Sequence, residues 1–300
     1  MIWNFTANPG YVFAILTTFC WTISALAFEI ASKRVGSVAV NLLRLLIALA
    51  LLGFITLHRT GHFIPPGVSD HQWRWLLLSG FVGFFVGDMA LFRAYVLIGS
   101  RLTTLLMVLA APFGAVCGYF MIGETLTPLK IIGMVIALGG VAWVCAERRE
   151  NDATPHHHVL IGVMLGIIAA FGQGLGAVLT KIGTQGLNAF EVTQIRVLAG
   201  VAGFIIAIPM MRQTGNVILA TRNPRAMVFL TIGAIAGPVL GVSSYNYAIT
   251  KIPVGIAGTL AAMVPVVIIP FVILVKKETV SIRAIVGAIV AVAGAVLLCI

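Results

Sequence analysis

Charged side chains are scarce in this chain of 300 residues. They make up only 9% of the sequence, whereas a soluble domain carries about 25%. Hydrophobic residues account for 60%, and the mean hydropathy is +1.08. A surface with so little charge would not stay dispersed in water, so most of the chain is expected to lie in lipid.

Motifs that would support several other function classes are missing. The sequence contains no HExxH, no paired-Asp motif and no GxSxG, which argues against an intramembrane enzyme. It contains no selectivity-filter or charge-ring pattern, which argues against a channel. The net charge of +10 is spread as single or paired Lys and Arg between apolar runs, without the basic stripe of a nucleic-acid binder. No nucleic-acid partner is therefore expected.

Metal-ligand spacing and a leader sequence are missing as well. The four cysteines all lie inside apolar runs, where a small apolar residue is the simpler interpretation (Cys20, Cys117, Cys145 and Cys299). No metal or cofactor is predicted. The N-terminal residues, MIWNFTANPG, have neither a basic region nor a small-residue cleavage site, so the first apolar run is expected to remain as a helix.

Ten apolar runs are each long enough to span a membrane as a helix, and the alternating pattern of a β-barrel is absent. They cover approximately residues 11–32, 39–57, 73–98, 102–122, 129–145, 160–181, 190–211, 228–249, 254–275 and 282–300. The longest polar stretch, ERRENDATPHHH, lies at the middle of the chain. We predict a first five-helix unit at 1–150, a linker at 151–158 and a second unit at 159–300. The histidines of this linker are more simply explained by a solvated loop than by a metal site.

The two units resemble each other in sequence. ETLTPLKIIGMVIALGG begins at residue 124 and ETVSIRAIVGAIVAVAG at residue 278, an offset of 154. The same offset pairs Gly133 with Gly287, Gly140 with Gly294, Gly87 with Gly241 and Ala94 with Ala248. Pro112 and Pro265 pair at 153, and Arg44 and Arg196 at 152. Matched Glu, Thr, Pro and Arg are hard to obtain by chance, so an internal duplication is predicted.

Five helices per unit is an odd number, so the second unit must enter the membrane in the opposite orientation. The predicted fold is therefore all-α, with about ten transmembrane helices in two inverted five-helix repeats around a central cavity. Such a pair can open alternately to either side. A channel has no need of this arrangement, which favours a carrier.

The loop charges predict an orientation. Connectors after the odd-numbered helices carry eleven Lys and Arg residues, against five in the others, which places both termini outside the cytoplasm. The predicted location is the plasma (inner) membrane, with membrane lipids as partners. The oligomeric state is left open, with a monomer as one possibility.

Pro112, then Gly123–Glu124, Gly133 and Gly140, with the same order repeated from Pro265, resemble the EamA repeat of the drug/metabolite transporter superfamily. The resemblance covers essentially the whole chain and is greatest to the YddG-type amino-acid exporters. Lys277 stands where the family usually has Gly. The resemblance implies a ten-helix fold and export of amino acids or related metabolites. It also implies cytoplasmic termini, in conflict with the charge count. Translocation of lipids or sugar nucleotides is the alternative.

Matched prolines and one intramembrane carboxylate are the first candidate site residues. Pro112 and Pro265, near the middle of helices 4 and 9, would kink them and free backbone carbonyls beside a binding site. Asp88 lies inside helix 3, where a carboxylate costs about 2.5–3.5 kcal/mol, so it should face a cavity or a cation. Arg93 is the nearest cation in the sequence, and a partner on another helix, such as Arg44, is equally possible. Asp88 could form a structural ion pair or bind an ammonium group or a proton. Arg44 and Arg196 are interpreted as structural.

Further polar or amphipathic side chains lie at membrane depth. An amphipathic solute needs a few directional groups among apolar walls. The candidates for substrate binding, besides Asp88, are Trp21, Gln173, Ser244, Tyr245 and Asn246. The adjacent Tyr245 and Asn246 cannot both face the centre. The expected function is secondary transport of a small molecule, most simply an aromatic or other neutral amino acid.

Overall fold

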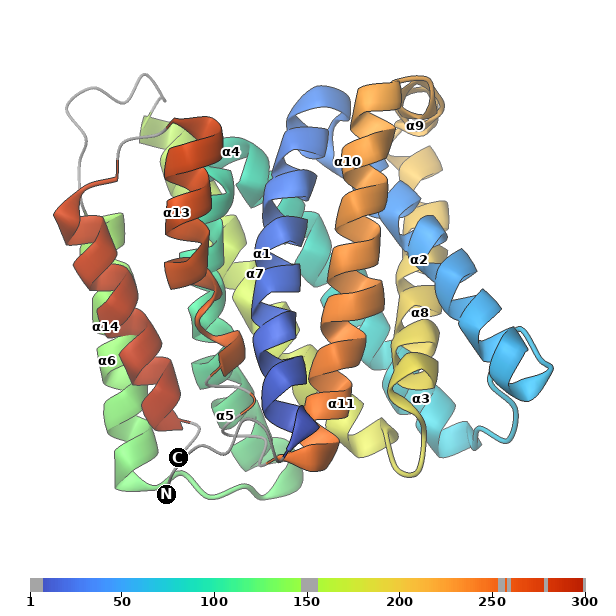
Figure 1. The fold of residues 1–300 in the computed structure, drawn as a ribbon, viewed down its shortest axis with the longest axis horizontal. Helices are drawn as coiled ribbons and strands as arrows, with labels where there is room; N and C mark the ends of the chain where they lie inside the picture. The colour runs from blue at the N-terminus through green and yellow to red at the C-terminus, as the bar shows by residue number, and fades with distance from the viewer. Residues whose placement is uncertain (1–7, 147–155, 253–256, 258–259, 278–279, 299–300) are drawn as a thin grey trace.

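The computed structural model describes residues 8–146, 156–252, 257, 260–277 and 280–298. Helices follow one another through these residues and pack side by side (Figure 1). They are α1 (Pro9–Val35), α2 (Ser37–Thr60), α3 (Asp70–Gly80), η1 (Phe81–Gly87), α4 (Asp88–Leu106), η2 (Met107–Leu109), α5 (Ala110–Ile122), α6 (Pro128–Cys145), α7 (His156–Gly183), α8 (Ala189–Met210), α9 (Thr214–Thr221), α10 (Pro224–Ala234), η3 (Ile235–Val242), α11 (Ser243–Lys251), α13 (Val264–Lys276) and α14 (Ile282–Leu298).

Ten membrane crossings account for these helices. Seven helices in the described residues are long and apolar enough to span, and one of them, Asp70–Ile122, has 53 residues. That helix is divided at Gly99, whose φ of 74° is a left-handed conformation that favours glycine. Dividing it, and adding the shorter apolar helices α13 and α14, gives the ten predicted spans. Residues 147–155, which include most of the predicted linker, lie outside the described residues. The helix α7 begins at His156, so the last three residues of the predicted linker already belong to this helix.

A buried carboxylate stabilises the break at Gly99. The change of direction leaves the Ser100 amide without a helical acceptor, and Glu29 Oε2 accepts its N–H at 2.7 Å. The other carboxylate oxygen accepts from Lys33 Nζ at 2.7 Å, as the i, i+4 spacing allows. Glu29 therefore ties α1 to the turn between the third and fourth spans.

The two halves run in opposite directions through the bundle. In Figure 1, α1 rises from the lower end whereas α7, the first helix of the second half, descends from the upper end. The start of α1 and the end of α14 lie at the same, lower end. This is the inverted arrangement that five spans per half require.

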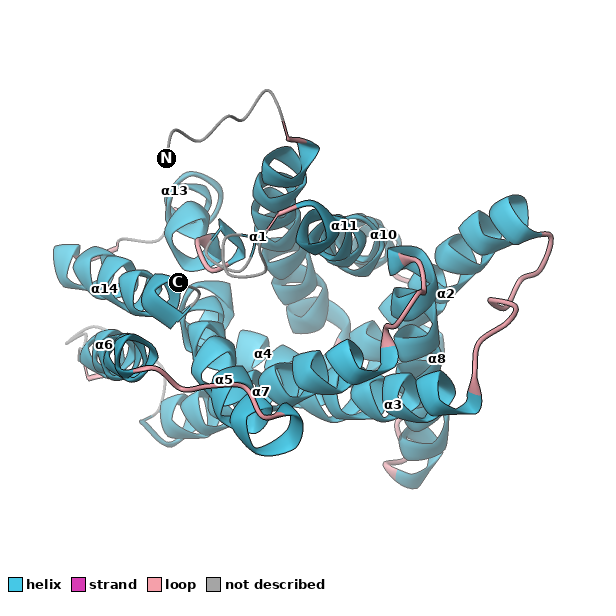
Figure 2. Ribbon diagram, turned by 90° about the horizontal axis from the view of Figure 1, so that it is seen from below, coloured by secondary structure: helices cyan, strands magenta, loops and turns pink. Residues whose placement is uncertain are grey.

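The packing of α6 against α14 follows the same two-fold relation. The helices are antiparallel neighbours at one side of the bundle (Figures 1 and 2). A Cβ on Gly140 would lie 2.5 Å from the Ala291 nitrogen, and one on Gly294 would lie 2.3 Å from the Ala137 nitrogen. Gly140 and Gly294, like Ala137 and Ala291, are equivalent at the offset of 154, so each contact is the image of the other. Small residues at these positions let the two backbones touch.

Two hydrogen bonds at equivalent places in the halves follow the same two-fold relation, but the serine donor lies on a different helix of each pair. Ser24 Oγ on α1 donates to the Gly233 carbonyl on α10 at 3.3 Å, and Ser79 Oγ on α3 donates to the Gly176 carbonyl on α7 at 2.7 Å. At the offsets of the duplication, 152 and 154, Ser24 corresponds to Gly176 and Ser79 to Gly233. Each contact therefore keeps one serine and one glycine, although the serine has moved to the other helix.

Both halves also contain a wide helical turn in the third span. The π-helices η1 and η3 begin at Phe81 and Ile235, which are 154 residues apart. Pro238 inside η3 removes a backbone donor, and glycines recur through both segments. The sequence analysis did not predict these turns. Since π-helical turns are frequent at functional sites, they direct attention to the residues around them.

The matched prolines have different local effects. Pro112 is the third residue of α5, which follows the 3-10 turn η2. It cannot donate a hydrogen bond to the carbonyl of Val108, which fits the change from α-helix to 3-10 turn at this point. Pro265 lies at the start of α13 after a turn at residues 262–263, so helix 9 is interrupted there and is not merely kinked. The predicted mid-helix kink is therefore corrected at Pro265: the proline begins a new helix.

The outer surface is apolar, as a lipid-facing surface must be. Large hydrophobic side chains such as Phe120 and Met210 are mostly exposed. A cavity of about 10 Å³ beside Pro265 is lined by Leu105 and Ile269, and an open groove of about 450 Å³ lies against Arg34 and Arg222. Neither is lined by the predicted substrate-binding residues, so a central cavity between the halves remains a prediction.

Candidate functional site

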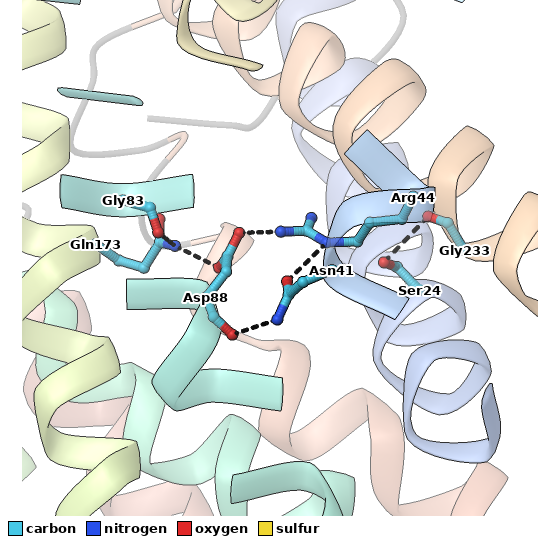
Figure 3. Close-up of polar contacts among 7 residues, drawn as sticks. All are labelled: Ser24, Asn41, Arg44, Gly83, Asp88, Gln173 and Gly233. Atoms are coloured by element: carbon cyan, nitrogen blue, oxygen red, sulfur yellow. Dashed lines mark hydrogen bonds and ion pairs between the residues drawn. The ribbon is translucent and has the colours of Figure 1, made fainter. Parts of the chain in front are cut away.

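Asp88 is at the centre of a polar cluster that joins both halves. It is the first residue of α4, directly after η1, and is 3% exposed. Its Oδ2 pairs with Arg44 Nη2 on α2, and its Oδ1 accepts from Gln173 Nε2 on α7 at 2.9 Å (Figure 3). Of the partners that the sequence left open, the structure selects Arg44. The structural ion pair is present, and a role in substrate binding stays a prediction.

Asn41 holds the ion pair in position. Its side chain donates to the Asp88 carbonyl at 3.1 Å and accepts from Arg44 Nε at 3.2 Å (Figure 3). Asn41 precedes Arg44 by three residues and therefore shares its helix face. The sequence analysis did not single it out, although the spacing in NLLR was an available signal.

Aromatic rings cover the guanidinium of Arg44. Its Cζ lies 4.5 Å from the Phe92 ring centroid, 5.4 Å from Phe28 and 5.9 Å from Phe84. Rings at this distance attract a cation and exclude water. Arg44 is thus fully accommodated by one carboxylate, one amide and three rings.

Arg196 approaches the same cluster from the second half. Arg44 and Arg196 are each the eighth residue of their helices, α2 and α8. The guanidinium of Arg196 lies 4.8 Å from the Phe84 ring centroid, so Phe84 contacts both arginines. Its charge is close enough to attract Asp88, but no ion pair among the described residues includes it.

The remaining candidates form a second group on α1 and α11. The rings of Trp21 and Tyr245 lie 5.7 Å apart, with Trp21 also against Gly241 of η3. Asn246 turns to the other side, where its Nδ2 donates to Thr193 Oγ1 on α8 at 3.2 Å. Ser244 is 6% exposed. The expectation that Tyr245 and Asn246 face different ways fits these contacts.

α8 connects the two groups. Thr193, the partner of Asn246, lies one helical turn before Arg196. Neither Thr193 nor Phe84 was singled out from the sequence, because only the fold places them between candidates from different helices.

Two inverted five-helix halves that meet at an ion pair and a second arginine form the inverted-repeat architecture that many membrane carriers share. Comparison with known proteins then gives the family. The chain belongs to the EamA-like transporter family, whose model matches residues 8–146 and again residues 160–300.

The individual relatives are distant. The chain is 24% identical over 208 residues to the uncharacterized transporter YetK of Bacillus subtilis (strain 168). That alignment covers 67% of this chain and 60% of YetK, so the chain spans less than two thirds of its relative's length. A protein of known crystal structure matches with a TM-score of 0.62 at 16% identity, over 96% of this chain and 95% of that one. At this identity the likeness shows the fold alone.

Proposed function

We propose that this transporter exports small amphipathic metabolites, foremost neutral and aromatic amino acids, by alternating access between its two halves. The observation that carries the proposal is the convergence of Arg44 and Arg196, one from each half, on Phe84 beside Asp88. Ionisable groups inside a membrane bundle are costly and typically mark a substrate or ion pathway. The resemblance to YddG-type exporters supports the same substrate class.

In this proposal the substrate lies between the two polar groups of residues. Trp21 and Tyr245 supply an amphipathic wall, while Asp88, Gln173, Ser244 and Asn246 supply directional polar contacts. Pro112 and Pro265 would be the points about which the fourth and ninth spans bend when the halves rock. The proposed location is the plasma membrane of a cell that must dispose of such metabolites.

Counterflow in reconstituted vesicles tests this function. Purified protein is placed in liposomes loaded with one unlabelled amino acid, and entry of the labelled form is followed with and without a pH gradient. We expect saturable accumulation that protein-free liposomes lack. Trp21→Ala should reduce this flux per folded molecule, because it removes the aromatic wall. Counterflow of a sugar nucleotide or of lipid, without any of amino acids, would contradict the proposal and favour the alternative substrate class.

A further inference from the structure

Arg196 is a buried cation that no carboxylate of the described residues pairs with. Only 8% of it is exposed, and its Nε has no hydrogen-bond partner among the described residues. It also belongs to none of the ion pairs that those residues form. A buried guanidinium is normally paired, and one left unpaired at membrane depth points to a function for its charge.

The neighbouring carboxylate is already committed. Asp88 is close enough to attract Arg196, but its two oxygens are bound to Arg44 and Gln173. Two guanidiniums and one carboxylate leave this part of the bundle with a net charge of +1. One further negative charge would neutralise it.

Two glycines lie beside the guanidinium. A Cβ on Gly83 of η1 would come 3.3 Å from Arg196 Nη2 and 3.8 Å from Gln173 Oε1, and a Cβ on Gly176 of α7 would come 3.7 Å from Arg196 Nη2. The Phe84 ring covers the cation at 4.8 Å without supplying an acceptor. A planar guanidinium that belongs to no ion pair of the described residues and has glycines beside it is suited to bind a carboxylate through two parallel hydrogen bonds.

Neutral polar and aromatic groups lie on the neighbouring turns of α8 and α11. Thr193 lies one turn before Arg196 and is bound to Asn246. The preceding residue of α11, Tyr245, faces the other way, and its ring lies 5.7 Å from that of Trp21. A solute with its carboxylate at Arg196 would therefore place an apolar or aromatic body beside groups suited to it.

We propose that Arg196 binds the carboxylate of the transported solute, and that the substrates are therefore small monocarboxylates and not the corresponding amines or amides. This rests on the proposed function, in that the solute is taken to bind between the halves. It changes the interpretation of Arg196 from a structural residue to a specificity-determining one. Arg44, whose partner is built into the fold, keeps the structural role.

Competition between matched solutes tests the proposal. Counterflow of labelled phenylalanine is measured in the presence of phenylalanine amide, phenethylamine or 3-phenylpropionate, for wild type, Arg196→Met and Arg196→Lys. Arg93→Met is the control, because Arg93 is an exposed cation on α4. We expect 3-phenylpropionate to compete and the amide and amine not to compete. Arg196→Met should raise the KM about 30-fold or more, Arg196→Lys should raise it less, and Arg93→Met should leave it unchanged.

A binding measurement separates this proposal from the transport function. The melting temperature of purified protein is recorded with 3-phenylpropionate and with its amide. A shift that requires both the carboxylate and Arg196 supports the proposal, even if wild type shows no amino-acid counterflow and the proposed export function fails. If Arg196→Met does not fold, Arg196→Lys replaces it in the comparison of acid with amide. Lysine keeps the charge but cannot form the two parallel hydrogen bonds, so the melting shift with the acid should be smaller than in wild type. Equal competition by acid and amide, or an unchanged KM in folded Arg196→Met, would overturn it. So would a melting shift that is the same for acid and amide.

Discussion

Arg44 and Arg196 occupy equivalent places in the two halves, yet their surroundings differ. Arg44 has a carboxylate, an amide and three rings around it, whereas Arg196 has one ring and no ion pair among the described residues. The difference arises because Asp88 has no acidic counterpart: the offset of 154 places Val242 there. A symmetric backbone thus holds an asymmetric distribution of charge. The backbone contacts between helices follow the two-fold relation, whereas the charged side chains at the junction of the halves do not.

Removing Asp88, the partner of Arg44, should lower the free energy of unfolding more than any other change considered. Asp88→Asn leaves a buried guanidinium unpaired, and breaking such a pair costs about 3–5 kcal/mol. The double variant Arg44→Met/Asp88→Asn should recover part of this loss, because no charge is then left alone. Unfolding free energies in detergent would check both. Full additivity of the two single changes would show that the ion pair contributes no coupling.

The α6–α14 contact should respond equally from its two sides. Gly140→Ala and Gly294→Ala each place a methyl group against the backbone of the facing helix, and such overpacking costs about 1–3 kcal/mol. Gly139→Ala is the matched control, since a Cβ there meets nothing within 4 Å and should stabilise the helix by about 0.5–1 kcal/mol. Unequal losses at positions 140 and 294 would weaken the two-fold interpretation of this interface.

Arg196→Met should change the free energy of unfolding in the opposite direction from Asp88→Asn, which removes the Arg44 ion pair. It removes an unpaired buried charge and keeps an unbranched apolar stem, so the unfolding free energy should stay the same or rise by about 1 kcal/mol. The measurement is thermal and detergent unfolding without any solute. A loss as large as that of Asp88→Asn would mean that Arg196 is structural after all.

Replacing Ser24 or Ser79, the serines of the two equivalent hydrogen bonds, should give the smallest change in the free energy of unfolding. Side-chain hydrogen bonds between membrane helices contribute about 0.6 kcal/mol on average. Ser79→Ala should cost more than Ser24→Ala, because the Ser79 bond is shorter, 2.7 Å against 3.3 Å, and Ser79 also contacts Thr180. Parallel unfolding curves of the two variants would measure the order. The reverse order would show that the surrounding packing outweighs the hydrogen bonds.

The sequence predicted much of the fold because lipid leaves few alternatives. Apolar runs of about 20 residues must become helices, and the matched Gly133/Gly287 and Gly140/Gly294 indicated the duplication that the α6–α14 packing displays. The orientation of the termini stays a prediction, since it depends on which side of a membrane the charged loops face.

What only the tertiary structure decided concerns contacts between distant segments. The π-helices depend on how the third spans pack, and the choice of Arg44 over Arg93 as the partner of Asp88 depends on which helices become neighbours. The same holds for Arg196, which belongs to no ion pair in the part of the chain that the structure describes. A sequence shows that two cations and one acid lie at membrane depth but not which cation the acid binds. The composition and the length of an apolar run are local properties, and they decide whether that run forms a helix in a bilayer. The pairing of charges is set by packing across the bundle, where residues 44, 88, 173 and 196 meet only after the chain has folded.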